Sequence, residues 1–229
     1  VIVLFLFALY EKKQEFPVFN IRVFIGNKMF RMSSLSALIN YSATFAISFM
    51  LSLYLQYVRG LSPRDAGLIL IIQSVIQAIA ALRSGSLSDK MSPTFLATIG
   101  MSIIAVGLGG LCFITETTSY YFIGIMMVLL GLGFGIFSSP NTNIIMSSVD
   151  RKHYGLASAT MGTMRLTGQS LSMGIAIMAM SIMIGNIDLS LAPHPQFIGS
   201  MRITFITFFV LCLFGVYASS VREKKKQKE

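Results

Sequence analysis

Long apolar stretches alternate along the chain with short polar connections. Six of them are long enough to cross a bilayer, because a hydrocarbon core of about 30 Å needs about 20 apolar residues of helix. They cover residues 32–57, 64–83, 93–115, 119–147, 155–184 and 199–220, and an apolar stub at residues 1–10 precedes them. Lipid offers no hydrogen-bond partner to an exposed peptide group, so each stretch is predicted to be a helix. The pattern therefore predicts an all-α integral membrane protein.

The polar segments divide the chain into four parts. Residues 1–10 start inside an apolar run, which indicates the end of a preceding transmembrane helix and a sequence taken from a longer protein. Residues 11–31 interleave aromatic and basic side chains, which is typical of a cytoplasmic amphipathic linker at the headgroup level. A plain tether between helices is the alternative. Residues 32–220 form the predicted six-helix transmembrane bundle, and residues 221–229 form a basic tail.

Composition excludes an ordinary soluble domain. The chain is 54% hydrophobic and 12% charged, whereas soluble domains carry about 25% charged residues. A net charge of +9 could suggest nucleic acid, but the basic residues lie in the short loops and the tail. Membrane orientation explains that placement better. The predicted partner is therefore the lipid bilayer, with no nucleic acid.

Basic residues gather on one side of the predicted membrane. One set of connections and the tail contain Lys12, Lys13, Arg22, Lys28, Arg31, Arg83, Lys90, Arg151, Lys152, Arg222, Lys224, Lys225, Lys226 and Lys228. The opposite loops and the adjoining ends of the spans contain only Arg59, Arg64 and Arg202. Short loops rich in Lys and Arg remain in the cytoplasm. Residues 11–31 and the C-terminus are therefore predicted to be cytoplasmic in a multi-pass protein of the cell membrane.

Side chains that would support catalysis are scarce. The two cysteines, Cys112 and Cys212, fall inside apolar spans, and the two histidines, His153 and His194, fall in loops. These positions suggest no metal-ligand cluster, no catalytic triad and no cofactor. The sequence therefore predicts that the chain is not an enzyme and that it has no catalytic or metal-binding residues.

Arg165 lies inside the fifth span, where an arginine costs about 2.5 kcal/mol or more at the bilayer centre unless it is paired or hydrated. One interpretation is a cation that faces a cavity and meets an anionic partner or governs alternating access. The other is an arginine that extends to the cytoplasmic interface or binds backbone carbonyls between helices.

Other polar and aromatic side chains in the spans are candidates for a weakly polar cavity. They are Asn40, Tyr41, Phe45, Gln73, Gln77, Asn141, Asn143 and Gln169. Hydrogen bonding between helices, worth about 0.6 kcal/mol per contact, is the alternative for each. Gly131, Gly135 and Gly168 belong to stripes of small residues, which favour close helix packing over helix sliding.

Residues 85–93 join the second and third spans as Gly85-Ser-Leu-Ser-Asp89-Lys90-Met-Ser92-Pro93. This segment resembles the cytoplasmic loop signature of the major facilitator superfamily, with Ser92 where the family has a second glycine. The glycine-rich run 131–135 with Pro140-Asn141, residues 155–174 around Arg165, and the linker at residues 16–24 are similar to the fourteen-helix drug:proton antiporters of the EmrB/QacA-type branch.

The resemblance implies the C-terminal half of a transporter, built from two inverted three-helix repeats. The first and fourth spans would face the cavity, the second and fifth would flank it, and the third and sixth would pack outside. The resemblance also implies a switch loop at Gly85, Asp89 and Lys90, the missing N-terminal half as a partner, and efflux of an amphipathic small molecule driven by the proton gradient.

Asp65 lies at the outer edge of the second predicted span, and no other Asp or Glu lies within the six, so the proton-binding group is expected in the missing half. The alternatives are a major facilitator carrier for a specific metabolite, such as a lipid, organic anion or siderophore, and a non-transporting membrane scaffold or sensor.

Overall fold

The computed structural model describes residues 26–88, 90–185 and 193–220. Its six helices of membrane-spanning length confirm the predicted all-α membrane fold. They are α3 (Lys28–Leu53) with the π-helical turn η1 (Tyr54–Val58), α4 (Pro63–Ser88), α5 (Pro93–Leu111), α6 (Tyr120–Ser147), α7 (Tyr154–Ile184) and α8 (His194–Ser219). A short 3₁₀ turn, η2 (Arg151–His153), precedes α7. The stub at 1–10, most of the 11–31 linker, Asp89 and the tail at 221–229 lie outside the described residues.

Side-chain caps explain where several helices begin. The Asn27 side chain accepts a hydrogen bond from the Phe30 amide at 3.0 Å, which caps α3. The Ser92 hydroxyl does the same for the Phe95 amide at 3.3 Å, and Pro93 occupies the first turn of α5. These residues satisfy amides that would otherwise lack a partner at a helix start. The helix starts are therefore encoded locally.

The end of α4 differs from the sequence prediction, in which Gly85 belonged to the connecting loop. The helix continues through Ser88, so Gly85 is helical and the connection to α5 is shorter than expected. The hydroxyls of Ser84 and Ser88 bond to carbonyls three residues earlier, at 3.2 and 3.0 Å. These bonds complement the backbone of the last turns and suit a helix that runs past the apolar stretch.

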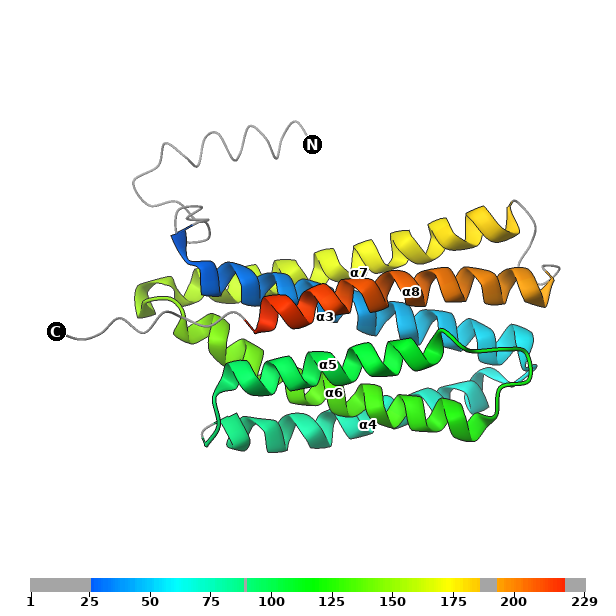
Figure 1. Cartoon of the computed structure of the whole chain (residues 1–229), viewed down its shortest axis with the longest axis horizontal. Helices are drawn as coiled ribbons and strands as arrows, with labels where there is room; N and C mark the ends of the chain where they lie inside the picture. Colours follow the sequence, from blue (N-terminus) through cyan, green and yellow to red (C-terminus); the bar gives the residue numbers. More distant parts are fainter. Residues whose placement is uncertain (1–25, 89, 186–192, 221–229) are drawn as a thin grey trace.

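In the packing of the six helices, the first helix of each half of the sequence contacts the second and third helices of the other half. In Figure 1, α3 lies with α7 and α8, whereas α6 lies with α4 and α5. Contacts between α5 and α8 join the two groups. If α3, α4 and α5 are matched with α6, α7 and α8, the pairing α3–α7 corresponds to α6–α4, and α3–α8 corresponds to α6–α5. The arrangement is that expected of two three-helix repeats.

Glycines allow the helices to approach closely at the two corresponding crossings. A Cβ atom on Gly135 of α6 would stand 2.6 Å from the Gln77 carbonyl oxygen of α4, and one on Gly131 would stand 2.6 Å from the Gln73 oxygen. A Cβ atom on Gly168 of α7 would stand 2.8 Å from the Leu38 oxygen of α3. The structure thus places all three glycines of the predicted packing stripes at backbone-to-backbone contacts.

A hydrogen bond from a serine hydroxyl joins the two helices at each of these crossings. The Ser84 hydroxyl donates to the Gly135 carbonyl at 3.0 Å and shares its hydrogen with the Ala81 carbonyl of its own helix. The Ser42 hydroxyl donates to the Gly168 carbonyl at 2.9 Å and shares its hydrogen with the Leu38 carbonyl. Both bonds between helices are buried. In lipid no hydrophobic effect drives helices together, so hydrogen bonds between helices supply a directional attraction.

The loop between α5 and α6 is held by two side chains from the η1 end of α3. Arg59, just after η1, donates to the carbonyls of Glu116 and Thr118 at 2.8 and 2.9 Å, and its guanidinium lies 4.5 Å from the centre of the Tyr120 ring. The interaction with Tyr120 raises the pKa of the guanidinium. The Tyr54 hydroxyl donates to the Thr115 carbonyl at 2.7 Å. These contacts fasten one end of α3 to the loop.

Replacement of Arg59 by glutamine is expected to lower the free energy of unfolding by about 1–3 kcal/mol, because it removes charge-assisted bonds to two carbonyls. Thermal unfolding of the purified protein in detergent measures the change. Arg64→Gln is the matched control, since Arg64 is exposed at the start of α4. Equal unfolding temperatures for the two variants would contradict a clamp at Arg59.

Candidate functional site

Exposed apolar side chains show which helix faces suit lipid. The outer face of α4 presents Leu68, Ile71, Val75, Ile79 and Leu82. Exposed large apolar side chains also occur on α5, α6, α7 and α8. Among the described residues, α3 has none. The accessible face of α3 is therefore unlike the others.

One side of that accessible face of α3 is polar. Tyr41, Thr44, Ser48 and Ser52 are spaced by three or four residues, so they share one side of the helix, and each is half-buried or exposed. Phe45 lies half-buried on the same side. We call Tyr41, Thr44, Ser48 and Ser52 the α3 polar stripe. A stripe of this kind at membrane depth is suited to a hydrated cavity or to another protein surface, rather than to lipid.

Hydrogen bonds within the helix satisfy several hydroxyls of the stripe. Thr44 donates to the Asn40 carbonyl at 2.8 Å, and Ser48 donates to the Thr44 carbonyl at 3.2 Å. These bonds leave the hydroxyl oxygens as neutral acceptors. Sequence reasoning selected Tyr41 and Phe45 but missed Thr44, Ser48 and Ser52. Their regular spacing in the first apolar stretch was the signal that could have identified them.

Arg165 of α7 lies beside this stripe. Its guanidinium carbon is 6.0 Å from the centre of the Tyr41 ring, and the arginine side chain is exposed. At 1.5 Å per residue, Arg165 sits about 16 Å from the start of a helix about 46 Å long. The backbone of Arg165 therefore lies within the span, and its guanidinium is on the same side of the bundle as the α3 polar stripe.

Arg165 makes no ion pair with any residue that the structure describes. Within the described residues, one ion pair is found, between Lys152 and Asp150 at 3.9 Å, and it lies in an exposed connection between helices. An unpaired arginine facing lipid would cost several kcal/mol, whereas water or a polar partner removes most of that cost. Arg165 thus favours a hydrated or protein-covered α3–α7 face over one that contacts lipid.

The remaining cavity candidates fall into two groups. Asn143 is exposed on α6, Gln169 is half-buried one turn after Arg165, and Gln77 is half-buried on α4. Asn40, Gln73 and Asn141 are buried between helices. The structure therefore brings Tyr41 and Arg165 together and places the second group inside helix contacts.

The buried amides are only partly satisfied by the protein. Asn141 donates to the Ser33 carbonyl at 3.2 Å, but its side-chain oxygen has no protein partner. The amide nitrogen of Asn40 also lacks one. Such atoms are costly in a dry interior and are usually paired with water or with a group that arrives in another conformation.

The predicted switch segment is described only in part. Lys90 is exposed, Gly85 is half-buried in α4, and a Cβ atom on Gly85 would stand 3.3 Å from the Ser139 hydroxyl. Asp89 lies outside the described residues. The structure thus places Gly85 at the α4–α6 contact instead of in a turn.

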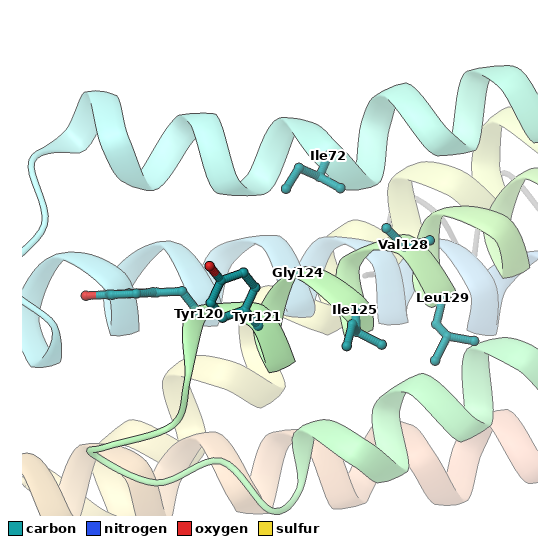
Figure 2. A pocket seen from close by; sticks show the side chains of 7 residues that line it. All are labelled: Ile72, Tyr120, Tyr121, Gly124, Ile125, Val128 and Leu129. Carbon is teal, nitrogen blue, oxygen red and sulfur yellow. The ribbon is translucent and has the colours of Figure 1, made fainter.

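An apolar groove of about 530 Å³ lies elsewhere, between α4 and α6. Figure 2 shows Ile72 on α4 opposite side chains of α6. The lining residues are Ile72, Tyr120, Tyr121, Gly124, Ile125, Val128 and Leu129. Tyr121 is 87% exposed and Ile125 is 58% exposed, so the groove opens to the outer surface of the bundle. It offers hardly any polar group to orient a ligand.

Comparison with known proteins agrees with this architecture. Residues 3–173 match the family described as the Major Facilitator Superfamily. The chain is 30% identical to the riboflavin transporter RibZ of Clostridioides difficile, over 72% of this chain and 36% of that protein. It is 28% identical to the multidrug efflux pump LfrA of Mycolicibacterium smegmatis, over 69% of this chain and 31% of that protein.

A resistance protein and a solved structure extend the likeness. The methylenomycin A resistance protein of Streptomyces coelicolor is 27% identical over 76% of this chain and 36% of its own length. A bacterial homologue of the human drug peptide transporters PepT1 and PepT2 has the same fold, with a TM-score of 0.70 at 16% identity, over 83% of this chain and 41% of that one. The chain spans about a third of the length of these curated relatives.

Proposed function

The chain belongs to the Major Facilitator Superfamily, and we propose that it forms the C-terminal half of an exporter that exchanges protons for amphipathic small molecules. It is a multi-pass membrane protein, and its relatives are transporters rather than enzymes. Several relatives confer drug resistance or export drugs. The observation that carries the proposal is the exposed Arg165 beside the α3 polar stripe, because a polar face at membrane depth is what a transport cavity requires.

The missing half of the transporter is part of this proposal. Superfamily members place the substrate site between two six-helix halves near the midplane. The α3–α7 face would cover that site from one side, and an N-terminal half would cover it from the other. The similarity of residues 16–24 to the linker of the fourteen-helix drug:proton antiporters supports that branch, in which additional helices separate the halves.

Proton coupling is expected to depend on that other half. The described acidic residues Asp65, Glu116 and Asp150 all lie at helix ends or in connections. A membrane-embedded carboxylate is the usual proton carrier in such transporters. Because the described helices contain none at membrane depth, the proton-binding carboxylate would come from the remainder of the protein, with the proton gradient as the energy source.

The charge distribution supports an orientation with residues 11–31 and the C-terminus in the cytoplasm. The start of α3, the end of α4 and the η2 turn contain Lys28, Arg31, Arg83, Arg151 and Lys152. The opposite end of the bundle contains Arg59, Arg64 and Arg202. The positive end is then the cytoplasmic one, in the plasma membrane of the cell.

A carrier for one metabolite is the second candidate, because the chain is 30% identical to a riboflavin transporter. The two candidates predict different ranges of substrate. A drug exporter accepts many amphipathic compounds, whereas a metabolite carrier saturates with one compound and rejects the others.

Dye export from pump-deficient cells that express the complete protein tests the proposal. We expect reduced retention of several amphipathic dyes, and a protonophore should restore that retention because it dissipates the driving gradient. Saturable transport of riboflavin alone would favour the metabolite carrier. No transport of any compound by protein that reaches the membrane would overturn both candidates.

A further inference from the structure

We propose that Arg165 and Tyr41 form a recognition site for organic anions, so that the exporter selects molecules with a carboxylate or a similar anionic group. This inference rests on the proposed transport function and names the substrate class of the same cavity. It starts from the exposed guanidinium, whose carbon lies 6.0 Å from the centre of the Tyr41 ring.

The charge of Arg165 is not neutralised by any described residue. Asp65 lies in the first turn of α4, and Glu116 and Asp150 lie in connections between helices. The α3 polar stripe next to the arginine supplies hydroxyls, which are neutral. This half of the cavity is therefore positive at membrane depth, where weak screening makes the charge attract anions and repel cations more strongly than in water.

The Tyr41 ring restricts where the arginine can lie. Tyr41 packs against a small apolar cluster formed by Phe30, Ala37, Ile145 and Ala157, which joins α3, α6 and α7. The ring thus packs against a cluster where α3, α6 and α7 meet, and the cation–π contact gives the guanidinium a preferred position beside it. A positioned guanidinium loses less freedom when it binds a ligand.

The chemistry of the exposed guanidinium favours a planar anionic group. Arginine presents five donors in a rigid fork that matches two carboxylate oxygens, and it retains its charge at any physiological pH. No described side chain bonds to these donors. Phe45 and Tyr41 add aromatic surface on the same side of α3. The site therefore suits a molecule that combines an apolar ring with an anionic group.

Two dyes with a shared xanthene skeleton and opposite charge test this assignment. Fluorescein is the anionic probe and rhodamine 123 is the cationic probe. Initial export rates over a range of dye concentrations, measured with the complete protein in pump-deficient cells, separate KM from the maximal rate. The variants are Arg165→Gln, Arg165→Lys and the exposed Arg64→Gln as a charge control outside the cavity face.

We expect Arg165→Gln to raise KM for fluorescein at least tenfold and to lower KM for rhodamine 123, because the substitution removes a charge that attracts the anion and repels the cation. Arg165→Lys should recover part of the affinity for fluorescein, because it restores the charge without the fork. Arg64→Gln should resemble the wild type with both dyes. Equal losses with both dyes in Arg165→Gln would overturn anion recognition, since they would assign the arginine to the transport cycle or to folding.

Wild-type export distinguishes failure of the inference from failure of the proposed function. Export of rhodamine 123 without export of fluorescein would leave the exporter standing and overturn the anion assignment. Export of neither dye, by protein that size-exclusion chromatography shows to be folded, would overturn the proposed drug exporter and the anion assignment together.

Discussion

Gly100→Ala is expected to lower the free energy of unfolding by about 3 kcal/mol or more, at the upper end of the range for overpacked sites. A Cβ atom on Gly100 of α5 would stand 2.6 Å from the Phe137 amide nitrogen and 2.8 Å from the Gly133 carbonyl oxygen of α6. Both are backbone atoms, which cannot rotate away as a side chain can. The helices would have to separate, and the core around Phe134 and Met101 would lose contacts.

Thermal unfolding in detergent, followed together with size-exclusion chromatography, measures the effect of Gly100→Ala. Gly124→Ala is the matched control, because no heavy atom lies within 4 Å of the Cβ position at Gly124 of α6. The control should unfold at or above the wild-type temperature, since alanine favours a helix more than glycine does. Wild-type stability of Gly100→Ala would show that α5 and α6 are not in backbone contact at this position.

Gly168→Ala is expected to reduce export of the anionic dye fluorescein at least tenfold in protein that still inserts into the membrane. Its Cβ atom would stand 2.8 Å from the Leu38 carbonyl oxygen and 3.1 Å from the Ser42 hydroxyl. The substitution would push α7 away from α3 and weaken the bond from Ser42 to the Gly168 carbonyl. Arg165 lies one turn away on the same helix, so its position beside Tyr41 would change.

Dye export, corrected for the amount of protein in the membrane, measures the loss in Gly168→Ala. Gly174→Ala is the control on the same helix, because Gly174 is exposed and no heavy atom lies within 4 Å of its Cβ position. It should export at the wild-type rate. If the two variants exported equally well, the α3–α7 crossing would not be needed for transport.

Much of the fold is readable along the chain, because the bilayer imposes a length and an apolar composition on every span. Each predicted stretch overlaps one of the six helices, although α3 begins at Lys28 and α8 at His194, both before the predicted starts at 32 and 199. The caps at Asn27 and Ser92 are local features. The end of α4 is the clearest difference. Its last turns contain Gly85 and several serines, which look like a loop in sequence but complete a helix whose hydroxyls bond to its own carbonyls.

The candidate site was only partly predictable. Arg165 stands out in any sequence as a charge within an apolar stretch. Its proximity to Tyr41 depends on the packing of α7 against α3, between residues more than a hundred positions apart. Gln73 and Asn40 have the same polarity as the accessible candidates, yet they are buried at helix contacts. Sequence could not separate these cases, because helices that are apolar on nearly all sides show little periodicity.

Sequence alone established the membrane class, the spans and the intramembrane arginine, because hydropathy and charge are summed over neighbours in the chain. The tertiary structure was needed to show which faces meet. It paired Gly100 with Gly133 and Gly168 with Leu38, and it left the α3 polar stripe accessible beside Arg165. Backbone approach at a glycine is set by the shape of the partner helix, and no local pattern contains that shape.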